Sequence, residues 1–303
     1  MSAIRITNDA LFDNFRQLRI EVEPELATAW MFMQPHPRPC FTPELLDEIQ
    51  QYQRMLVHYR GHLPQGNELV RIDYQVLASS DPAIFNLGGD LERFLRCIEN
   101  RDAEWLRRYG YACVEAGYRS LTGYDQSITT ISLMRGEALG GGLESALFSH
   151  VMIAERDAKM GLPEVLFNLF PGMGAFQLIA RRTSAAQAQR MIQSGRIYGA
   201  EELYDLGIVD VLAEPGDGIA ALHAYVKSHR RRQNANLAIE RVRRLAAPVS
   251  YDELTKVVDI WVDAAMQLDE RDRRTIQRLI RSQNRLPGAP AVQAAEPPLR
   301  EVG

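Results

Sequence analysis

Strand-like and helix-like hydrophobic patterns alternate along this chain, and that alternation is its strongest constraint on fold. Short apolar runs rich in Val, Ile and Tyr predict strands, at residues 19–23, 26–33, 68–78, 127–134 and 150–155. Helical periodicity predicts helices over residues 43–59, 91–121 and 142–149, and further helices dominate the C-terminal part to about residue 285. Strands that alternate with helices are typical of an α/β fold. No internal sequence repeat is evident.

Composition limits the classes of function. The chain has 303 residues, of which 46% are hydrophobic and 24% charged, enough for one large core. Its net charge of -4 provides no basic field for nucleic acid, and no apolar run approaches the roughly 20 residues of a membrane helix. The first residues lack the apolar segment of a secretory signal, so we expect a cytoplasmic protein. Cys40, Cys97 and Cys113 are widely spaced, which favours buried free thiols over disulfides or a zinc site.

The segment GEALGGGLES, residues 136–145, places three glycines between a predicted strand and a predicted helix. A phosphate-binding P-loop would need lysine where Gly142 stands, and a dinucleotide fingerprint would need glycine where Ser145 stands, so neither motif fits. What remains is a helix N-terminus with free backbone N–H groups. The N–H of Gly141 could hold a developing oxyanion, because glycine has no side chain to block close approach.

A second loop, IFNLGGDL over residues 84–91, has the same design. Asp90 is expected to cap the following helix and to leave the N–H of Leu87 exposed. Two such loops could form one oxyanion hole, with Leu87 and Gly141 as its donors. The alternative, that each glycine pair only makes a tight turn from strand to helix, stays open at this point.

Two carboxylates follow the glycine segments. Glu144 lies just inside the helix after the triple glycine, and Glu164 follows Pro163, which is typical of a helix start. Either glutamate could be there only because a carboxylate is favourable near a helix N-terminus. Both are flanked by Leu, Val, Ala or Phe, however, and apolar surroundings raise the pKa of a carboxyl group toward the range that acid–base catalysis uses.

Four separated segments together resemble the crotonase (enoyl-CoA hydratase/isomerase) superfamily, closely over about residues 65–215. They are IFNLGGDL, GEALGGGLE, MGLPEVLFNLFPGMGA and AEELYDLGIVDVL. The resemblance implies a ββα spiral core and a thioester carbonyl held by Leu87 and Gly141, without metal or cofactor. It also implies that Glu144 and Glu164 serve the α-proton and the β-oxygen. We expect Glu164 to accept the α-proton and Glu144 to serve the β-hydroxyl, and the reverse assignment stays open.

Within the superfamily, FNLGGDL, the paired glutamates and LPEVLFNLFPGMGA are most similar to bacterial diffusible signal factor synthases, which make cis-2-unsaturated fatty acids for quorum sensing. That resemblance implies dehydration of a 3-hydroxyacyl chain on acyl carrier protein, then thioester hydrolysis to the free acid. It allows a regulatory sensor protein as a further partner. Two alternatives stay open: an enoyl-CoA hydratase or isomerase that uses CoA thioesters, and a non-catalytic binding protein on the same scaffold.

Apolar residues are frequent in the segments around both glutamates. They could pack in the core or line a pocket for the acyl chain. They are Leu143, Met160, Leu162, Val165, Leu166, Phe167, Leu169, Phe170, Met173 and Phe176. Basic clusters at residues 229–234, 241–244 and 271–274 are expected to be solvated faces with ion pairs. Docking of an acidic carrier protein is one alternative; RNA binding is the weakest, because no aromatic residues are interleaved.

The chain is expected to have three parts. Residues 1–220 form a catalytic core, residues 221–285 a helical trimerisation region, and residues 286–303 a tail whose Pro and Ala content predicts disorder. Residues 255–268 carry an apolar stripe with helical period, which must pack on something. Because crotonases use such helices to cover a neighbouring active site, the resemblance implies a homotrimer or a dimer of trimers.

Overall fold

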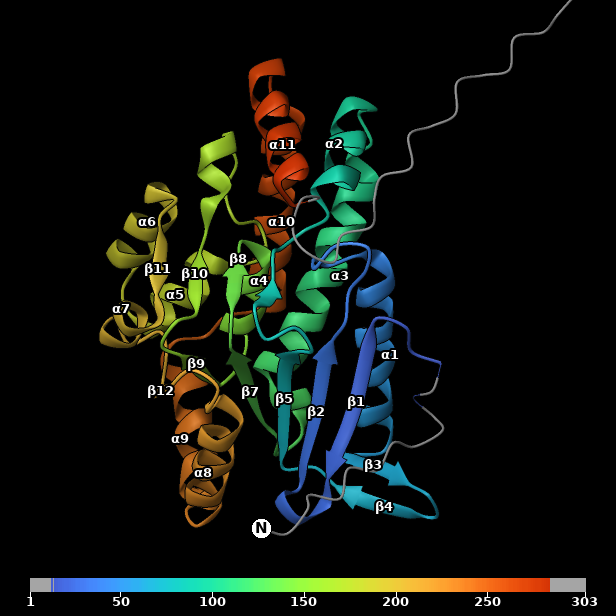
Figure 1. Ribbon diagram of the computed structural model, residues 1–303, viewed down its shortest axis with the longest axis vertical. Helices are drawn as coiled ribbons and strands as arrows, with labels where there is room; N and C mark the ends of the chain where they lie inside the picture. The colour runs from blue at the N-terminus through green and yellow to red at the C-terminus, as the bar shows by residue number, and fades with distance from the viewer. Residues whose placement is uncertain (1–11, 13, 284–303) are drawn as a thin grey trace, which may run out of the picture.

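Two β-sheets and the helices around them form the predicted α/β fold (Figure 1). The computed structural model describes residue 12 and residues 14–283, and over these the larger sheet has six strands in the order β1-β2-β5-β7-β9-β12. All neighbouring strands are parallel except the antiparallel pair β1–β2. These strands are Leu18–Glu23 (β1), Thr28–Met33 (β2), Tyr74–Ser79 (β5), Thr129–Met134 (β7), Val151–Glu155 (β9) and Val211–Ala213 (β12).

A smaller sheet lies beside the larger one, in the order β11-β10-β8-β6. The pairs β6–β8 and β8–β10 are parallel, and β11 is antiparallel to β10. Its strands are Ile84–Asn86 (β6), Glu137–Leu139 (β8), Lys159–Gly161 (β10) and Ile197–Gly199 (β11). A separate antiparallel hairpin joins His62–Gln65 (β3) to Glu68–Arg71 (β4).

Helices cover both faces of the larger sheet. Along β2, Met31 packs in the main core with α1 and α3, whereas the next residue, Phe32, packs on the opposite face with Leu222 of α8. The helices are Pro43–His58 (α1), Leu91–Glu99 (α2), Ala103–Leu121 (α3), Gly141–Leu147 (α4), Ala175–Arg182 (α5), Ala185–Ser194 (α6), Ala200–Asp205 (α7), Gly218–Arg230 (α8), Gln233–Ala246 (α9), Tyr251–Met266 (α10) and Glu270–Gln283 (α11). Short 3-10 turns occur at Pro24–Leu26 (η2), Gly123–Asp125 (η3) and Pro163–Phe167 (η4).

A ββα unit recurs three times and positions the candidate site. Strands β5, β7 and β9 of the larger sheet are each followed by a strand of the smaller sheet, β6, β8 and β10, and then by α2, α4 and η4. This is the predicted ββα spiral, although the repeated units share no evident sequence repeat. Because β6, β8 and β10 are parallel neighbours, their C-terminal ends meet at one edge of the sheet. The two glycine loops and Glu164 follow directly from those ends.

Two long predicted elements are each divided in the structure. Residues 68–78 form β4 and β5, because β4 pairs back on β3 while β5 enters the larger sheet. Residues 91–121 form α2 and α3, with Arg101 in the left-handed region at φ 57° between them. Asp102 then caps α3 by accepting a hydrogen bond from the N–H of Trp105 at 3.0 Å.

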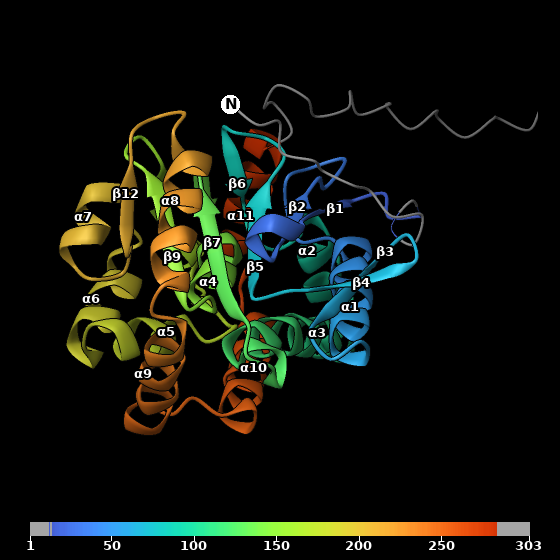
Figure 2. The ribbon, with the colours of Figure 1, turned by 90° about the horizontal axis from the view of Figure 1, so that it is seen from below.

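The C-terminal helices return to their own chain. Helix α10 lies against α3 (Figure 2), and the predicted stripe is buried there, through Val258, Trp261, Val262, Ala265 and Leu268. A Cβ atom on Gly110 of α3 would lie 2.5 Å from Val258 Cγ1, so the two helices approach closely. The stripe therefore covers this chain rather than a neighbouring active site, which corrects the expectation. The predicted tail, residues 286–303, lies outside the described residues, and no described helix is long and apolar enough to cross a membrane.

Candidate active site

The loops that follow β6 and β8 touch backbone to backbone. A Cβ atom on Gly142 would lie 2.0 Å from the carbonyl oxygen of Asn86, and one on Gly88 would lie 3.0 Å from the amide nitrogen of Gly141. Gly88 also has φ 94°, in the left-handed region that favours glycine. The glycines therefore make the tight turns and also permit contact between the two loops.

The free N–H groups at this contact are not the predicted pair. The N–H of Leu87 donates to the carbonyl oxygen of Pro39 at 2.8 Å, so the expectation that it is exposed to an oxyanion is wrong. The cause is the segment before α1, which runs beside this loop and also bonds to it through the N–H of Phe41. Among the described residues, no acceptor faces the N–H groups of Gly89 and Gly141. A Cβ atom on Gly141 would lie 3.5 Å from the nitrogen of Gly89, so two free donors lie close together.

Glu144 lies in the first turn of α4 and is 2% exposed. Its Oε1 accepts hydrogen bonds from the N–H groups of Met173 at 2.8 Å and Ala175 at 3.1 Å. Ala175 begins α5, so the carboxylate also meets the positive end of that helix. Burial raises the pKa of Glu144 to about 7, and the two N–H groups oppose this rise by stabilising the charged form.

Glu164 lies in η4, close to the loop that carries Gly140. A Cβ atom on Gly140 would lie 2.6 Å from Glu164 Oε1, so glycine leaves room for this carboxyl group. The Glu164 Oε2 is buried and has no hydrogen-bond partner in the part of the chain that the structure describes. Burial, and then the negative charge of Glu144, raise the pKa of Glu164 to about 8. The two carboxyl groups therefore titrate as a pair that holds about one proton near neutral pH.

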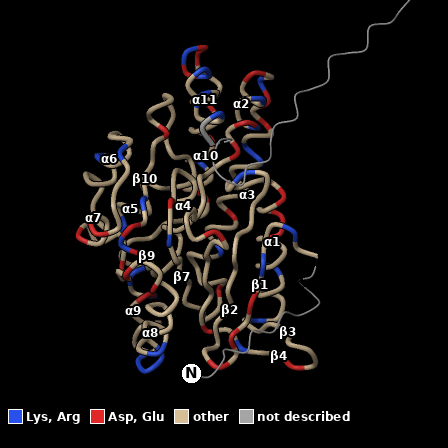
Figure 3. The backbone as a smooth tube through the Cα atoms, in the orientation of Figure 1, with Lys and Arg blue, Asp and Glu red and all other residues tan. Residues whose placement is uncertain are grey.

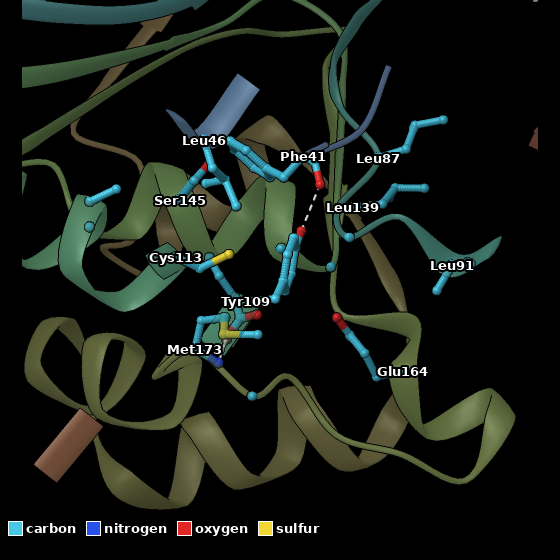
Figure 4. A pocket seen from close by; sticks show the side chains of 18 of the residues that line it. Phe41, Leu46, Leu87, Leu91, Tyr109, Cys113, Leu139, Ser145, Glu164 and Met173 are labelled. Atoms are coloured by element: carbon cyan, nitrogen blue, oxygen red, sulfur yellow. Dashed lines mark hydrogen bonds between the residues drawn. The ribbon is translucent and has the colours of Figure 1, made fainter. Parts of the chain in front are cut away.

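One cavity of about 300 Å³ joins these groups (Figure 4). Gly89, Gly141, Glu144 and Glu164 all line it, so both carboxyl groups and both free donors belong to one space. Leu87 lines it as well, although its N–H is engaged elsewhere. Figure 4 shows the Glu164 carboxyl group directed into this space. The volume is at the lower end of the range for small-molecule sites.

Helices α1 and α3 form a deep wall of the cavity that the sequence did not indicate. The lining residues of α3 fall on one helix face, at Tyr109, Cys113, Ala116, Gly117 and Ser120, and those of α1 are Leu46, Ile49 and Gln53. Cys113 lies within electrostatic range of Glu144: burial mainly, with a contribution from that carboxylate, raises the pKa of the thiol to about 12. A helix face that lines a cavity has the same sequence pattern as one that packs in a core, so no sequence signal marks this wall.

The ten apolar residues around the glutamates fall into three groups. Four line the cavity: Phe167, Leu169, Phe170 and Met173. Three are buried in the core instead: Leu143, Met160 and Leu162. Three are exposed: Val165, Leu166 and Phe176.

The three cysteines are free thiols, but only Cys40 is fully buried. Cys97 and Cys113 pack against the core but are only half-buried, which corrects the expectation that all three thiols are buried. Cys113 is half-buried because it opens onto the cavity.

Comparison with known proteins agrees with this architecture. The family model described as enoyl-CoA hydratase/isomerase matches residues 70–280. A probable enoyl-CoA hydratase of Bacillus subtilis is 32% identical over 139 residues, which are 46% of this chain and 52% of that protein, so the match spans about half the length of this relative. The structure of Pseudomonas aeruginosa DspI is similar with a TM-score of 0.64 and 25% identity, over 91% of this chain and 100% of DspI. Human mitochondrial delta3-delta2-enoyl-CoA isomerase, 18% identical, has the same fold with a TM-score of 0.71, over 88% of this chain and 98% of the isomerase. The chain belongs to the enoyl-CoA hydratase/isomerase family.

Proposed function

We propose that this protein dehydrates a 3-hydroxyacyl thioester to the cis-2-enoyl thioester and then hydrolyses it to the free acid. The observation that carries this proposal is the convergence of two buried carboxyl groups and two free glycine N–H groups on one cavity. Gly89 and Gly141 would hold the carbonyl oxygen, which becomes negative both in an enolate and in the tetrahedral adduct of hydrolysis. One oxyanion hole thereby serves both steps.

The carboxyl pair shares a proton, and this arrangement can serve both addition of water to the enoyl thioester and dehydration of the 3-hydroxyacyl thioester. Because Glu144 is the more acidic of the two, it carries the charge in the resting site and Glu164 carries the proton. With Glu144 charged and Glu164 protonated, the site is ready for addition of water, because Glu144 can accept a proton from water and Glu164 can donate one to the α-carbon. Dehydration with Glu164 as the base needs the opposite state, which is reached by moving one proton within the pair. We therefore retain Glu164 as the group that serves the α-carbon and Glu144 as the group that serves the β-oxygen.

The position of one basic cluster supports an acidic carrier protein as the substrate donor. Residues 271–274 lie on α11, which also places Leu279 in the cavity wall. The clusters at 229–234 and 241–244 lie on or between α8 and α9, and in the second cluster Arg243 and Arg244 bond to backbone carbonyls of this chain. Helix α11 carries five arginines against Glu270 and Asp272 (Figure 3), so its local charge is positive and could attract an acidic carrier although the whole chain is acidic.

An enoyl-CoA hydratase or isomerase acting on CoA thioesters is equally supported by the family match. A non-catalytic binding protein is a weaker alternative, because such a protein has no need of two buried, ionisable groups in its cavity. Two assays separate the three. The enzyme is incubated with 3-hydroxyacyl carrier protein, and free thiol and cis-2-enoic acid are measured together. Release of both supports the proposal. Rapid hydration of crotonyl-CoA without either product supports the hydratase, and inactivity in both assays supports the binding protein.

A further inference from the structure

Helix α4 lies along the cavity from Gly141, one of the two free donors, to Phe148. Four of its residues line the cavity, at positions 141, 144, 145 and 148, and this spacing places them on one face of the helix. Phe148 directly follows the last turn and keeps right-handed helical angles, with φ -70° and ψ -16°. Because Phe148 is seven residues beyond Gly141, it lies about 10 Å further along the helix axis. The cavity therefore reaches well beyond the expected position of the carbonyl oxygen.

The ring of Phe148 closes this end of the cavity. It packs on the backbone of α3 at Gly117, where a Cβ atom would lie 2.5 Å from both Cδ2 and Cε2 of the ring. The ring thus occupies the space that any larger residue at position 117 would need. The hydroxyl of Ser149, the next residue, lies 2.7 Å from that of Ser132 in β7, so the larger sheet backs the ring. Phe148 is 2% exposed, the same fraction as Glu144, as expected for the wall of a narrow, enclosed space.

The other side of the cavity opens to solvent. Its half-buried or exposed lining residues are Leu91, Glu137, Leu139, Phe170 and Leu279. Figure 4 shows Leu91 and Leu139 on the side of the cavity away from Ser145. On the inner side, Ile49 and Phe148 are only 4% and 2% exposed. A carrier protein or CoA is too large to enter the cavity, so its linker must leave by the open side, and the apolar chain is driven to the dry inner side.

We propose that Phe148 limits the length of the acyl chain, and that the substrates are medium-chain acyl thioesters. With the carbonyl oxygen at Gly89 and Gly141, the chain passes Glu144 and extends along α4 until its end meets the ring. An extended chain advances about 1.2 Å per bond, so a depth of about 10 Å corresponds to roughly eight bonds. Chains of about eight to ten carbons therefore fill the inner side. The inference rests on the proposed function in requiring that an acyl carbonyl bind at the two glycine N–H groups.

The test measures the binding of S-(2-oxoalkyl)-CoA analogues, in which a ketone takes the place of the thioester carbonyl and cannot be hydrolysed. Saturated chains of about 6 to 16 carbons bracket the expected limit. Calorimetry gives the dissociation constant of each analogue. For the wild type, this constant is expected to fall about 4-fold for each added methylene up to about ten carbons, and then to stop falling.

Removing the ring should move this limit. In Phe148→Ala, the dissociation constant is expected to go on falling for about three further methylenes, because the space left by the ring closes only in part. Phe170→Ala makes the same change on the open side of the cavity; it is the matched control and keeps the length limit of the wild type. Should Phe148→Ala fail to fold, Phe148→Leu takes its place and moves the limit by about one methylene.

An unchanged limit in the folded Phe148 variant would overturn the proposal. A limit that moves in Phe170→Ala instead would also overturn it, since the chain would then lie on the open side. Absence of binding by every analogue would mean that no acyl chain enters the cavity, with the same result for the proposal. The analogues have no β-hydroxyl group and no thioester, so they undergo neither dehydration nor hydrolysis. A failure of the proposed reaction and a failure of this inference therefore give separate results.

Discussion

At the scale of single residues, the two glutamates differ in burial and in hydrogen-bond partners: Glu144 is buried, whereas Glu164 is half-buried with a buried Oε2. Glu144 accepts two backbone N–H bonds, whereas Glu164 Oε2 has no partner in the described residues. The difference separates the pKa values of the pair, because N–H donors favour only the charged form. The environment of each carboxyl group, rather than its residue type, therefore sets its pKa.

Replacing either glutamate by glutamine should abolish dehydration. Glu144→Gln and Glu164→Gln each remove one proton-transfer group, and the expected loss in rate is about 100- to 10,000-fold. Hydrolysis of a supplied cis-2-enoyl thioester needs only the oxyanion hole and one carboxylate, so one variant should retain measurable hydrolysis. Product formation from 3-hydroxyacyl carrier protein is measured for both, with the exposed Glu99→Gln as the control. Near-normal dehydration by a folded Glu144→Gln or Glu164→Gln variant would show that the two-glutamate mechanism is wrong.

The raised pKa of Glu164 should also appear in the pH dependence of stability. The folded protein holds this proton up to about pH 8, whereas the unfolded chain releases it above the ordinary value of 4.5. The free energy of unfolding therefore falls as the pH rises from about 4.5 to about 8. Glu164→Gln removes this contribution, so between pH 5 and pH 8 it should gain free energy of unfolding relative to the wild type. Urea unfolding at both pH values measures the gain; Glu99→Gln should show none, and a parallel pH profile for Glu164→Gln would contradict the assignment.

At the scale of elements, the contact between the two glycine loops is open to a direct test. Alanine normally stabilises a helix by about 1 kcal/mol relative to glycine, yet a Cβ on Gly142 in α4 would meet the Asn86 carbonyl at 2.0 Å. Gly142→Ala is therefore expected to lower the free energy of unfolding by about 3 kcal/mol. Gly66→Ala is the control: Gly66 has φ 59° but nothing within 4 Å of its Cβ position, so only backbone strain of about 1 kcal/mol applies. Similar losses in the two variants would mean that the loops can separate.

The sequence predicted correctly those helices and strands whose hydrophobic pattern matches their burial in the structure. The strands β7 and β9 and helix α1 lie within two residues of their predicted positions. The division of residues 91–121 was missed because Arg101, an ordinary residue, adopts a left-handed conformation there. Leu87 was misassigned because its N–H bonds to Pro39, a long-range contact that no local pattern contains. The cavity wall on α1 and α3 was missed for the same reason. Whether a helix face lines a cavity or packs in the core depends on distant parts of the chain and not on the sequence of the helix itself.

At the scale of the whole molecule, helix α9 offers a face for the proposed trimer. None of its residues is buried, and Ile239, Val242 and Leu245 are 64%, 63% and 83% exposed on successive turns. The apolar stripe of α10 packs against α3 within the chain, whereas α9 carries three of the exposed large apolar side chains of the C-terminal helices. If the trimer that the family resemblance implies forms, we expect α9 to contribute a subunit contact.

The double substitution Val242→Asp and Leu245→Asp should dissociate the trimer into single chains. Two charges placed in an apolar interface lose their hydration without gaining partners, so association should weaken by at least about 100-fold. Light scattering at micromolar concentration measures the mass. Leu69→Asp, on the exposed hairpin strand β4, is the control and should leave the mass unchanged. A wild type with the mass of one chain would refute the trimer itself.

The wall of the cavity joins parts of the chain that are made at very different times. It combines Met31 of β2 with Trp261 of α10 and Leu279 of α11. A ribosome adding about 5–20 residues per second needs roughly 10 to 50 s to pass from the first of these to the last. For that interval the nascent chain presents the apolar interior of its own cavity to the solvent. The site is complete only after Leu279 has been synthesised, and until then the surface destined for the substrate is available to chaperones.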